Sequence, residues 1–433
     1  MFKRVIELVN LLLHQHPVNV VIVITILGAL LRILWVVWID PQPYTDFKVY
    51  RALAIQLAEG NGYSNQDGSP AGFFMVGYPF LLSIVIRIFG DHLIYLQLMN
   101  VLFSTAAIPL SYLLARSFLS FRVSITVATF VAVNPSFVLY SGVLATENPS
   151  LFMIMGLWYL GICTYAVRPT VLQSFAYGLM VAASIYVRPV AFVILTTVSG
   201  ARWLTSTKKS GVAVSFILTL VVVLVALAPW VIRNGRVMGW YTIHTEIGLN
   251  MWIGFSPEAT GGLGVPPLPA SALGLNPKKQ EDGGGSEWNR MAQKAAVESI
   301  LDDPMRAIKL IPAKVFHLWA GHRHAITHST RSSDTVLPKF IRVILPIWTQ
   351  SFLYGLMGLT ILAFLKFPGF RFWLRFPANT VPISLVMWTL FHLPVFGAGR
   401  FHVPIEIALI MGASVAVDEI IRNRFRLRFF FRH

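Results

Sequence analysis

The sequence has 433 residues, of which 55% are hydrophobic and only 12% are charged. Soluble globular domains carry about 25% charged residues, so this composition excludes a cytosolic enzyme, a nucleic-acid-binding domain and a disordered chain. The net charge of +16 then bears on orientation in a bilayer rather than on affinity for nucleic acid. The single cysteine, Cys163, lies in an apolar run and excludes an intrachain disulfide.

Ten apolar runs are predicted to span a membrane, for which a helix needs about 20 residues. They are 18–38, 93–115, 123–143, 149–167, 171–187, 189–204, 212–231, 346–365, 379–394 and 402–420. The first run is too long for a signal peptide and lacks a small-residue cleavage site, which indicates a retained span. An eleventh run, Phe74–Phe89, is shorter and is expected to lie at the membrane surface or to re-enter it.

The distribution of charge predicts which side each connection occupies. With ten spans and a cytoplasmic N-terminus, the inner segments hold 16 basic and 3 acidic residues, whereas the outer segments hold 18 basic and 15 acidic residues. Cytoplasmic segments carry the excess of Lys and Arg, so both termini are predicted to be cytoplasmic. Counting Phe74–Phe89 as a span would place Arg116 and Arg122 outside and spoil this alternation.

The predicted fold is therefore an all-α polytopic membrane protein with about ten transmembrane helices in one domain, residues 1–433. Two outer loops, residues 39–92 and 232–345, are expected to carry helices beside the membrane, and residues 421–433 form a basic cytoplasmic tail. The second loop is rich in Gly and Pro around Gly261–Gly285. No sequence repeat of the kind found in many transporters is evident.

Two outer acids are the candidate catalytic residues. Asp46 follows the first span and begins an amphipathic stretch, and Glu147 lies between the third and fourth spans. Either carboxylate can take a proton from an acceptor hydroxyl, or the two can hold a divalent cation. The alternative for each is a helix cap or an ordinary loop carboxylate.

Three arginines at outer span ends are the candidate phosphate ligands: Arg188, Arg233 and Arg400. A guanidinium binds phosphate oxygens through two parallel hydrogen bonds, although such residues also snorkel to lipid headgroups. Glu406, inside the last span, requires a partner, for which Arg400 and Arg32 are candidates.

Four histidines in the second loop form a further polar group. They are His317, His322, His324 and His328, and the last two are spaced by one helical turn. That spacing suits a metal pair, but surface or interface positions are the more common role of such histidines.

A series of short motifs recurs along most of the chain in a recognisable order. It comprises Asp46-x-x-x-Tyr50, Gly60-Asn61-Gly62-Tyr63, Val76-Gly77-Tyr78-Pro79, Asn134-Pro135, Thr146-Glu147-Asn148, Ala228-Pro229-Trp230-x-x-Arg233-Asn234, Gly248-x-Asn250-x-Trp252-x-Gly254 and Arg400-Phe401-x-x-Pro404. This order resembles the GT-C membrane glycosyltransferases, in particular the bacterial branch similar to protein mannosyltransferases and the lipid A aminoarabinose transferase. Relatives often have a Lys or Arg with paired prolines where this chain reads Phe74-Met75-Val76-Gly77-Tyr78-Pro79, so a phosphate contact from that position is not carried over to this chain.

The resemblance implies an inverting transfer of a hexosyl or pentosyl group from a polyprenyl-monophosphate donor to a lipid, polysaccharide or protein. It places the active site on the periplasmic or extracellular side of a bacterial inner membrane. Asp46 matches the expected base and Glu147 its partner. Arg400 matches the phosphate site, with Arg188 and Arg233 as further candidates.

Tyr50 and Lys48, beside Asp46, and His402, beside Arg400, complete the predicted substrate-binding set. The resemblance implies no certain cofactor for this reaction. A divalent cation is the alternative. The chain's expected partners are the lipid-linked donor, the acceptor and membrane lipids.

Two other functions remain open from the sequence. A transporter or flippase of lipid-linked sugars would use the same arginines for phosphate, but Arg32 and Glu406 are the only charged residues that lie well inside the predicted spans. An O-antigen ligase or polymerase would use a pyrophosphate-linked glycan without an acid in the first loop.

Overall fold

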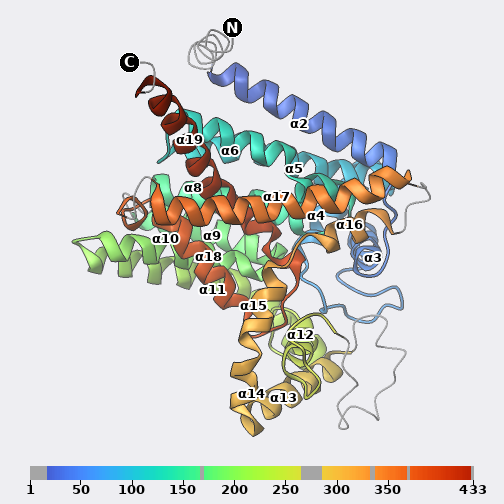
Figure 1. Ribbon diagram of the computed structural model, residues 1–433. Coiled ribbons are helices and arrows are strands. Elements are labelled where there is room, and N and C mark those ends of the chain that lie inside the picture. Colours follow the sequence, from blue (N-terminus) through green and yellow to red (C-terminus); the bar gives the residue numbers. More distant parts are fainter. Residues whose placement is uncertain (1–16, 166–169, 265–284, 332–336, 368–370, 431–433) are drawn as a thin grey trace.

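The computed structural model describes residues 17–165, 170–264, 285–331, 337–367 and 371–430, and this part of the chain is helical (Figure 1). The basic N-terminal residues and residues 265–284 of the second loop, about which predictions were made, lie outside the described residues. Within the described ranges, β structure is limited to the isolated bridges Ser64–Pro70 and Gly262–Gly397.

The helices follow the predicted runs closely. In the first half they are α2 (Pro17–Ile39), α3 (Asp46–Glu59), α4 (Gly77–Phe89), α5 (Leu93–Arg116), α6 (Phe121–Val133), α7 (Pro135–Leu139), the 3-10 helix η1 (Tyr140–Gly142), α8 (Glu147–Leu160), the π-helical segment η2 (Gly161–Tyr165), α9 (Val171–Val187), η3 (Pro189–Ala191) and α10 (Phe192–Thr205).

The second half continues with the longest helix of the bundle. The elements are α11 (Lys209–Met238), α12 (Glu246–Phe255), α13 (Ser286–Asp302), α14 (Pro304–Lys309), α15 (Ile311–Trp319), α16 (Arg323–Thr330), α17 (Lys339–Lys366), η6 (Phe372–Leu374), α18 (Thr380–His392), η7 (Gly399–Ile405) and α19 (Glu406–Phe430).

Four of the described helices, α2, α5, α11 and α17, are long and apolar enough to cross a membrane unaided, and the bent pair from Phe121 to Gly142 makes a fifth candidate. The ten predicted spans are therefore not reproduced as ten full-length helices. One predicted span bends by 44° at Asn134 and Pro135, because proline cannot continue the hydrogen-bond ladder. Others are short: α9 has 17 residues and α18 has 13. At 1.5 Å per residue, α18 is about 20 Å long.

Helix α4 agrees with the prediction that residues 74–89 form a short apolar helix rather than a full span. One face is fully buried through Tyr78 and Leu82, while Phe80, Ile88 and Phe89 are exposed. At 13 residues the helix is too short to cross a bilayer core of about 30 Å. It packs against α3 and α5 and closes one side of the first loop.

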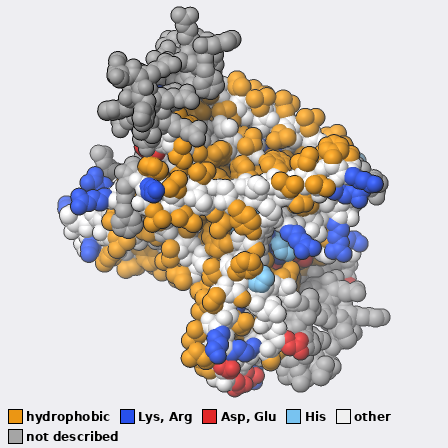
Figure 2. Space-filling model, in the orientation of Figure 1, with side chains coloured by type: hydrophobic (Ala, Val, Ile, Leu, Met, Phe, Trp, Pro, Cys, Tyr) orange, Lys and Arg blue, Asp and Glu red, His pale blue; other side chains and the backbone are white. Residues whose placement is uncertain are grey.

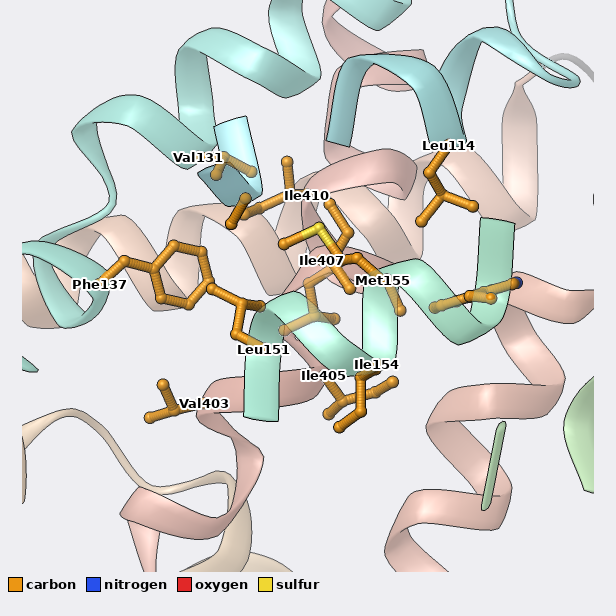
Figure 3. Packing of buried hydrophobic residues seen from close by; sticks show 14 of the residues in the cluster. Leu114, Val131, Phe137, Leu151, Ile154, Met155, Val403, Ile405, Ile407 and Ile410 are labelled. Atoms are coloured by element: carbon orange, nitrogen blue, oxygen red, sulfur yellow. The ribbon is translucent and has the colours of Figure 1, made fainter. Parts of the chain in front are cut away.

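Helix α19 is the central element of the bundle and packs against α17, α6 and α18. Figure 3 shows Ile407 and Ile410 from this helix between Leu151 and Met155 of α8 and Val131 of α6. Small residues permit a close approach: a Cβ at Gly412 would collide with the Thr360 side chain of α17.

The outer surface of the bundle is apolar, whereas the second loop is mixed. Orange side chains cover much of the helical bundle in Figure 2, acidic and basic groups gather on the protruding α13–α14 end, and basic groups also lie at the edges of the bundle. Helices α12 and α13 pack as a pair around Trp252, Trp288, Ala292 and Ala296. This distribution fits an integral membrane protein with a polar extension at one end.

Candidate active site

A pocket of about 190 Å³ lies where the first loop, the second loop and three helix ends meet. Its walls include the first turn of α3, the start of α8, the α9–α10 connection, the start of α12 and the segment η7. Segments separated by up to several hundred residues thus converge on one cavity. Of the eight residues predicted for the site, the structure places Asp46, Glu147, Arg188, Arg400 and Tyr50 in its lining.

Asp46 and Arg400, which both line the pocket, form an ion pair with 3.3 Å between Oδ2 and Nη1. Asp46 is the first residue of α3 rather than its N-cap, which is Thr45 at φ 46°. The alternative of a capping carboxylate is therefore not supported by the geometry. Burial alone would lower the pKa of Arg400, but the carboxylates of Asp46, Glu147 and Glu246 raise it well above its usual value, so the guanidinium stays charged.

Glu147 makes the second ion pair, with 3.3 Å between its Oε1 and Nη1 of Arg188. The carboxylate is in the first turn of α8, where the helix dipole favours negative charge, and its side chain is only 5% exposed. Arg188 also donates to the Thr146 hydroxyl at 3.4 Å and lies 5.9 Å from the Phe401 ring centroid. The two arginines therefore approach the same aromatic ring, since Arg400 is 5.6 Å from it.

A third carboxyl group, Glu246, lines the same pocket and was missed by the sequence analysis. Burial, and then the negative charge of Asp46, raise its pKa to about 7, opposed by Arg400 and by a hydrogen bond with Asn250. The nearby motif Gly248-x-Asn250 was noted in the sequence, but nothing marked Glu246 among the other loop acids.

Three predicted site residues lie elsewhere. The guanidinium of Arg233 donates through Nη2 to the carbonyl oxygen of Tyr63 at 2.7 Å and through Nη1 to that of Ala71, which anchors the first loop to α11. Lys48 is exposed on α3 and outside the pocket lining. His402 is fully buried behind the pocket. Their predicted contacts with substrate have no support in this arrangement.

His402 instead belongs to a buried network with His322 and Glu406. Nε2 of His322 lies 2.8 Å from Oε1 of Glu406 and 3.1 Å from Nε2 of His402. Asn134 donates to the other carboxylate oxygen of Glu406 at 2.8 Å. The partners of Glu406 are thus neither Arg400 nor Arg32, contrary to the expectation from sequence.

Arg32 is held by the bundle itself. It donates to carbonyl oxygens of Gly28, Val131 and Ala132 and to the Ser104 hydroxyl at 2.7–3.0 Å. These bonds satisfy the guanidinium at the bend between α6 and α7, where proline leaves backbone carbonyls without helical donors. The residue is a structural bridge between α2 and its neighbours.

Among the described residues, the pocket carboxylates do not belong to a group of three possible metal ligands within 4.8 Å of one another. Asp46 and Glu147 are each paired with an arginine, and among the described residues the group of three donors within 4.8 Å of one another is His322, His402 and Glu406. The predicted pair His324 and His328 is not part of it. Their rings stack at 5.7 Å, and Nδ1 of His328 lies 2.6 Å from the Tyr44 hydroxyl.

No protein-family model and no curated protein matches the sequence. Solved structures of an oligosaccharyltransferase from Archaeoglobus fulgidus do match in three dimensions. The complex with zinc and sulfate has a TM-score of 0.52 and 13% identity over 95% of this chain. The form tethered to an acceptor peptide has a TM-score of 0.53 and also 13% identity, again over 95% of this chain.

A third structure of the archaeal enzyme, with an inhibitory peptide and a dolichol phosphate, has a TM-score of 0.52 and 12% identity over 95% of this chain. The chain spans about half the length of these proteins: 50% of the first two and 51% of the third. At this identity the likeness shows the fold and not the reaction. The chain therefore shares its fold with about half of the archaeal oligosaccharyltransferase.

Proposed function

We propose that this protein is an inverting glycosyltransferase that moves a hexosyl or pentosyl group from a polyprenyl-monophosphate donor to a hydroxyl acceptor. The acceptor is a lipid, a polysaccharide or a protein, and the reaction takes place at the periplasmic or extracellular face of a bacterial inner membrane. The observation that carries the proposal is a pocket at one end of an apolar bundle in which two carboxylate–arginine pairs converge.

The charges of this pocket suit a phosphate leaving group. Arg188 and Arg400 supply planar guanidinium groups beside the same ring, Phe401, and such groups bind phosphate oxygens through two bonds. Each arginine is paired with a carboxylate at 3.3 Å. The donor phosphate competes with these carboxylates for the guanidinium groups. Donor binding therefore releases a carboxylate from its arginine.

Asp46 is the proposed base. Its carboxylate takes the proton of the acceptor hydroxyl while the acceptor oxygen bonds to the anomeric carbon and the bond from that carbon to the phosphate oxygen breaks. The electron pair of the broken bond leaves with the polyprenyl phosphate. Arg400 stabilises this growing negative charge, and a cationic group that acts more strongly as charge develops lowers the barrier.

Glu147 is the proposed partner of this base. It lines the same pocket, in the first turn of α8, and is paired with Arg188. Its side chain is positioned to orient an acceptor hydroxyl or to hold Arg188 against the donor phosphate. In the archaeal oligosaccharyltransferase, peptide and dolichol phosphate were bound together, which supports a lipid donor for this fold as well.

The decisive experiment uses the full chain in liposomes that contain a labelled polyprenyl-phosphate sugar and extracted envelope acceptors. Transfer or hydrolysis of the labelled sugar supports the proposal. Movement of intact donor between leaflets without bond cleavage overturns it in favour of a flippase. In parallel liposomes that contain a labelled pyrophosphate-linked glycan, consumption of that glycan alone identifies a ligase or polymerase instead.

The matched control for loss of the base is Asp91→Asn. Asp91 lies on the same loop and also pairs with an arginine, Arg51, at 2.9 Å, but on the exposed surface. Both substitutions remove one carboxylate from one arginine pair. Only Asp46→Asn is expected to lower the rate of transfer strongly.

A further inference from the structure

Three buried donor atoms converge at the junction of the second loop with α19. Nε2 of His322 lies 2.8 Å from Oε1 of Glu406 and 3.1 Å from Nε2 of His402, and these last two atoms are 3.4 Å apart. All three side chains are fully buried. We propose that these residues bind one divalent transition-metal ion of the zinc class, which fastens the second loop to the last helix.

The ligand set is one that zinc uses. Two imidazoles and one glutamate occur as three protein ligands of zinc, with bonds of about 2.0–2.2 Å. Tetrahedral bonds of that length place neighbouring donor atoms about 3.4 Å apart. The His402–Glu406 separation of 3.4 Å equals this value, whereas the His322–His402 pair at 3.1 Å and the His322–Glu406 pair at 2.8 Å are shorter than it. Small side-chain movements therefore suffice to admit the ion.

A backbone hydrogen bond fixes His402 in the tautomer that leaves Nε2 free to bind a metal. Its Nδ1 lies 2.6 Å from the carbonyl oxygen of Leu318, and a carbonyl accepts only, so Nδ1 carries the proton. Nε2 then presents its lone pair to His322 and Glu406. Metal-bound histidines are oriented in the same way, with the second nitrogen donating to a carbonyl or carboxylate.

Glu406 is oriented by a comparable outer contact. Asn134 donates to Oε2 at 2.8 Å and leaves Oε1 to face the two histidines. The Trp319 ring stacks on His402 with 5.5 Å between centroids and limits its rotation. A carboxylate buried in an apolar bundle is costly unless it is compensated, and a dication supplies that compensation while both imidazoles stay neutral.

The position of the cluster defines what the ion would do. His322 is the N-cap of α16, His402 lies in η7, and Glu406 begins α19. Arg400, the proposed phosphate ligand, lies two residues before His402 in η7. The ion would hold this segment in register with the second loop, which makes His322, His402 and Glu406 positioning residues rather than catalytic ones.

Metal content is measured first on the unsubstituted triad. The full chain is purified through a histidine-free tag in a Cys163→Ser background, since Cys163 has an exposed thiol and cysteine thiolates are zinc ligands. After removal of metal with a chelator and equilibration with ZnCl₂, elemental analysis is expected to find one tightly bound zinc per chain. A content well below one zinc per chain overturns the proposal, whatever the variants do.

The variants assign that ion to the cluster. His322→Ala and Glu406→Gln are expected to lose the bound zinc, whereas His324→Ala, two residues away and outside the cluster, keeps it. Equal zinc in His322→Ala and the parent overturns the assignment. Cobalt binding provides an optical check, because tetrahedral cobalt absorbs visible light and octahedral cobalt scarcely does.

Thermal unfolding supplies a readout that does not depend on turnover. An ion bound only by the native state raises the unfolding midpoint, so zinc is expected to raise the midpoint of the chelated parent but not that of chelated His322→Ala. The same shift in both proteins overturns the proposal. None of these measurements uses a sugar donor, so their failure is distinguishable from failure of the proposed transferase activity.

Discussion

Asp46 and Glu147 occupy equivalent electrostatic situations but differ in access. The Asp46 side chain is 36% exposed, whereas that of Glu147 is 5% exposed, and each lies 3.3 Å from an arginine. A base that must meet an incoming acceptor needs the more accessible position. Accessibility therefore favours Asp46 for proton transfer and Glu147 for holding Arg188 and the pocket wall.

Asp46→Asn is expected to lower the rate of transfer at saturating donor by about 10²–10⁴-fold, because it removes the proton acceptor but keeps the size of the side chain. The initial rate with labelled donor, measured on folded and monodisperse protein, checks this. Asp91→Asn should keep the parental rate. A parental rate in Asp46→Asn would transfer the role of base to Glu147.

Arg400→Ala is expected to impair donor use more than Arg400→Lys, because lysine keeps a point charge but loses the planar fork. Loss of a charge-assisted contact costs about 1.5–3 kcal/mol, or roughly ten- to a hundredfold in kcat/KM for the donor. Arg51→Ala, on the exposed Asp91 pair, is the matched control. Unchanged donor kinetics in Arg400→Ala would exclude this residue from the phosphate site.

Glu246 gives the site a dependence on pH. Its pKa is raised to about 7, so the carboxyl is neutral below that pH and adds a negative charge above it. Since the donor phosphate is an anion, the KM for donor should rise as the pH is increased through about 7. Glu246→Gln should flatten this profile. A parental pH profile of KM in the variant would show that another group titrates.

At the scale of elements, the sequence predicts the positions of the helices better than it predicts their lengths. The runs of apolar residues locate all the bundle helices, but the bend at Asn134–Pro135 and the π-helical segment Gly161–Tyr165 shorten regular structure in ways that hydropathy does not register. The sequence also could not predict which acidic and basic residues form ion pairs in the site. Asp46 and Arg400 are 354 positions apart, and Glu246 resembles any other loop acid until burial makes it distinctive.

The packing of α12 on α13 gives a test of the second loop. A Cβ at Gly248 would collide with the backbone of Asn289, whereas a Cβ at Gly358 of α17 would meet open space. Gly248→Ala is expected to destabilise the protein by about 1–3 kcal/mol and to lower its unfolding midpoint in detergent. Gly358→Ala should be neutral or slightly stabilising, since alanine favours helix. Equal midpoints in the two variants would contradict the described packing.

For the molecule as a whole, the pocket and the charge pattern agree. The connections assigned to the outer side by charge contribute Asp46, Glu147, Arg188, Glu246 and Arg400 to one pocket. In the predicted order of ten spans these residues come from every second connection, as chain segments at one end of an alternating bundle must. The sequence can predict which connections share one end of the bundle, because that assignment depends on the order of the apolar runs and charges. The exact length of each helix does not affect it.

The orientation of this end of the bundle is the remaining prediction. Inner segments are expected to carry 16 basic and 3 acidic residues against 18 and 15 outside, so the pocket should face away from the cytoplasm. In a Cys163-free background, a cysteine at Ser69, which is exposed in the first loop, should react in intact cells with an impermeant thiol reagent. A cysteine at Lys208, which is exposed in the α10–α11 connection, should react only after the cells are opened. The reverse pattern would place the pocket on the cytoplasmic side, where a donor facing the outer leaflet cannot reach Asp46 or Arg400.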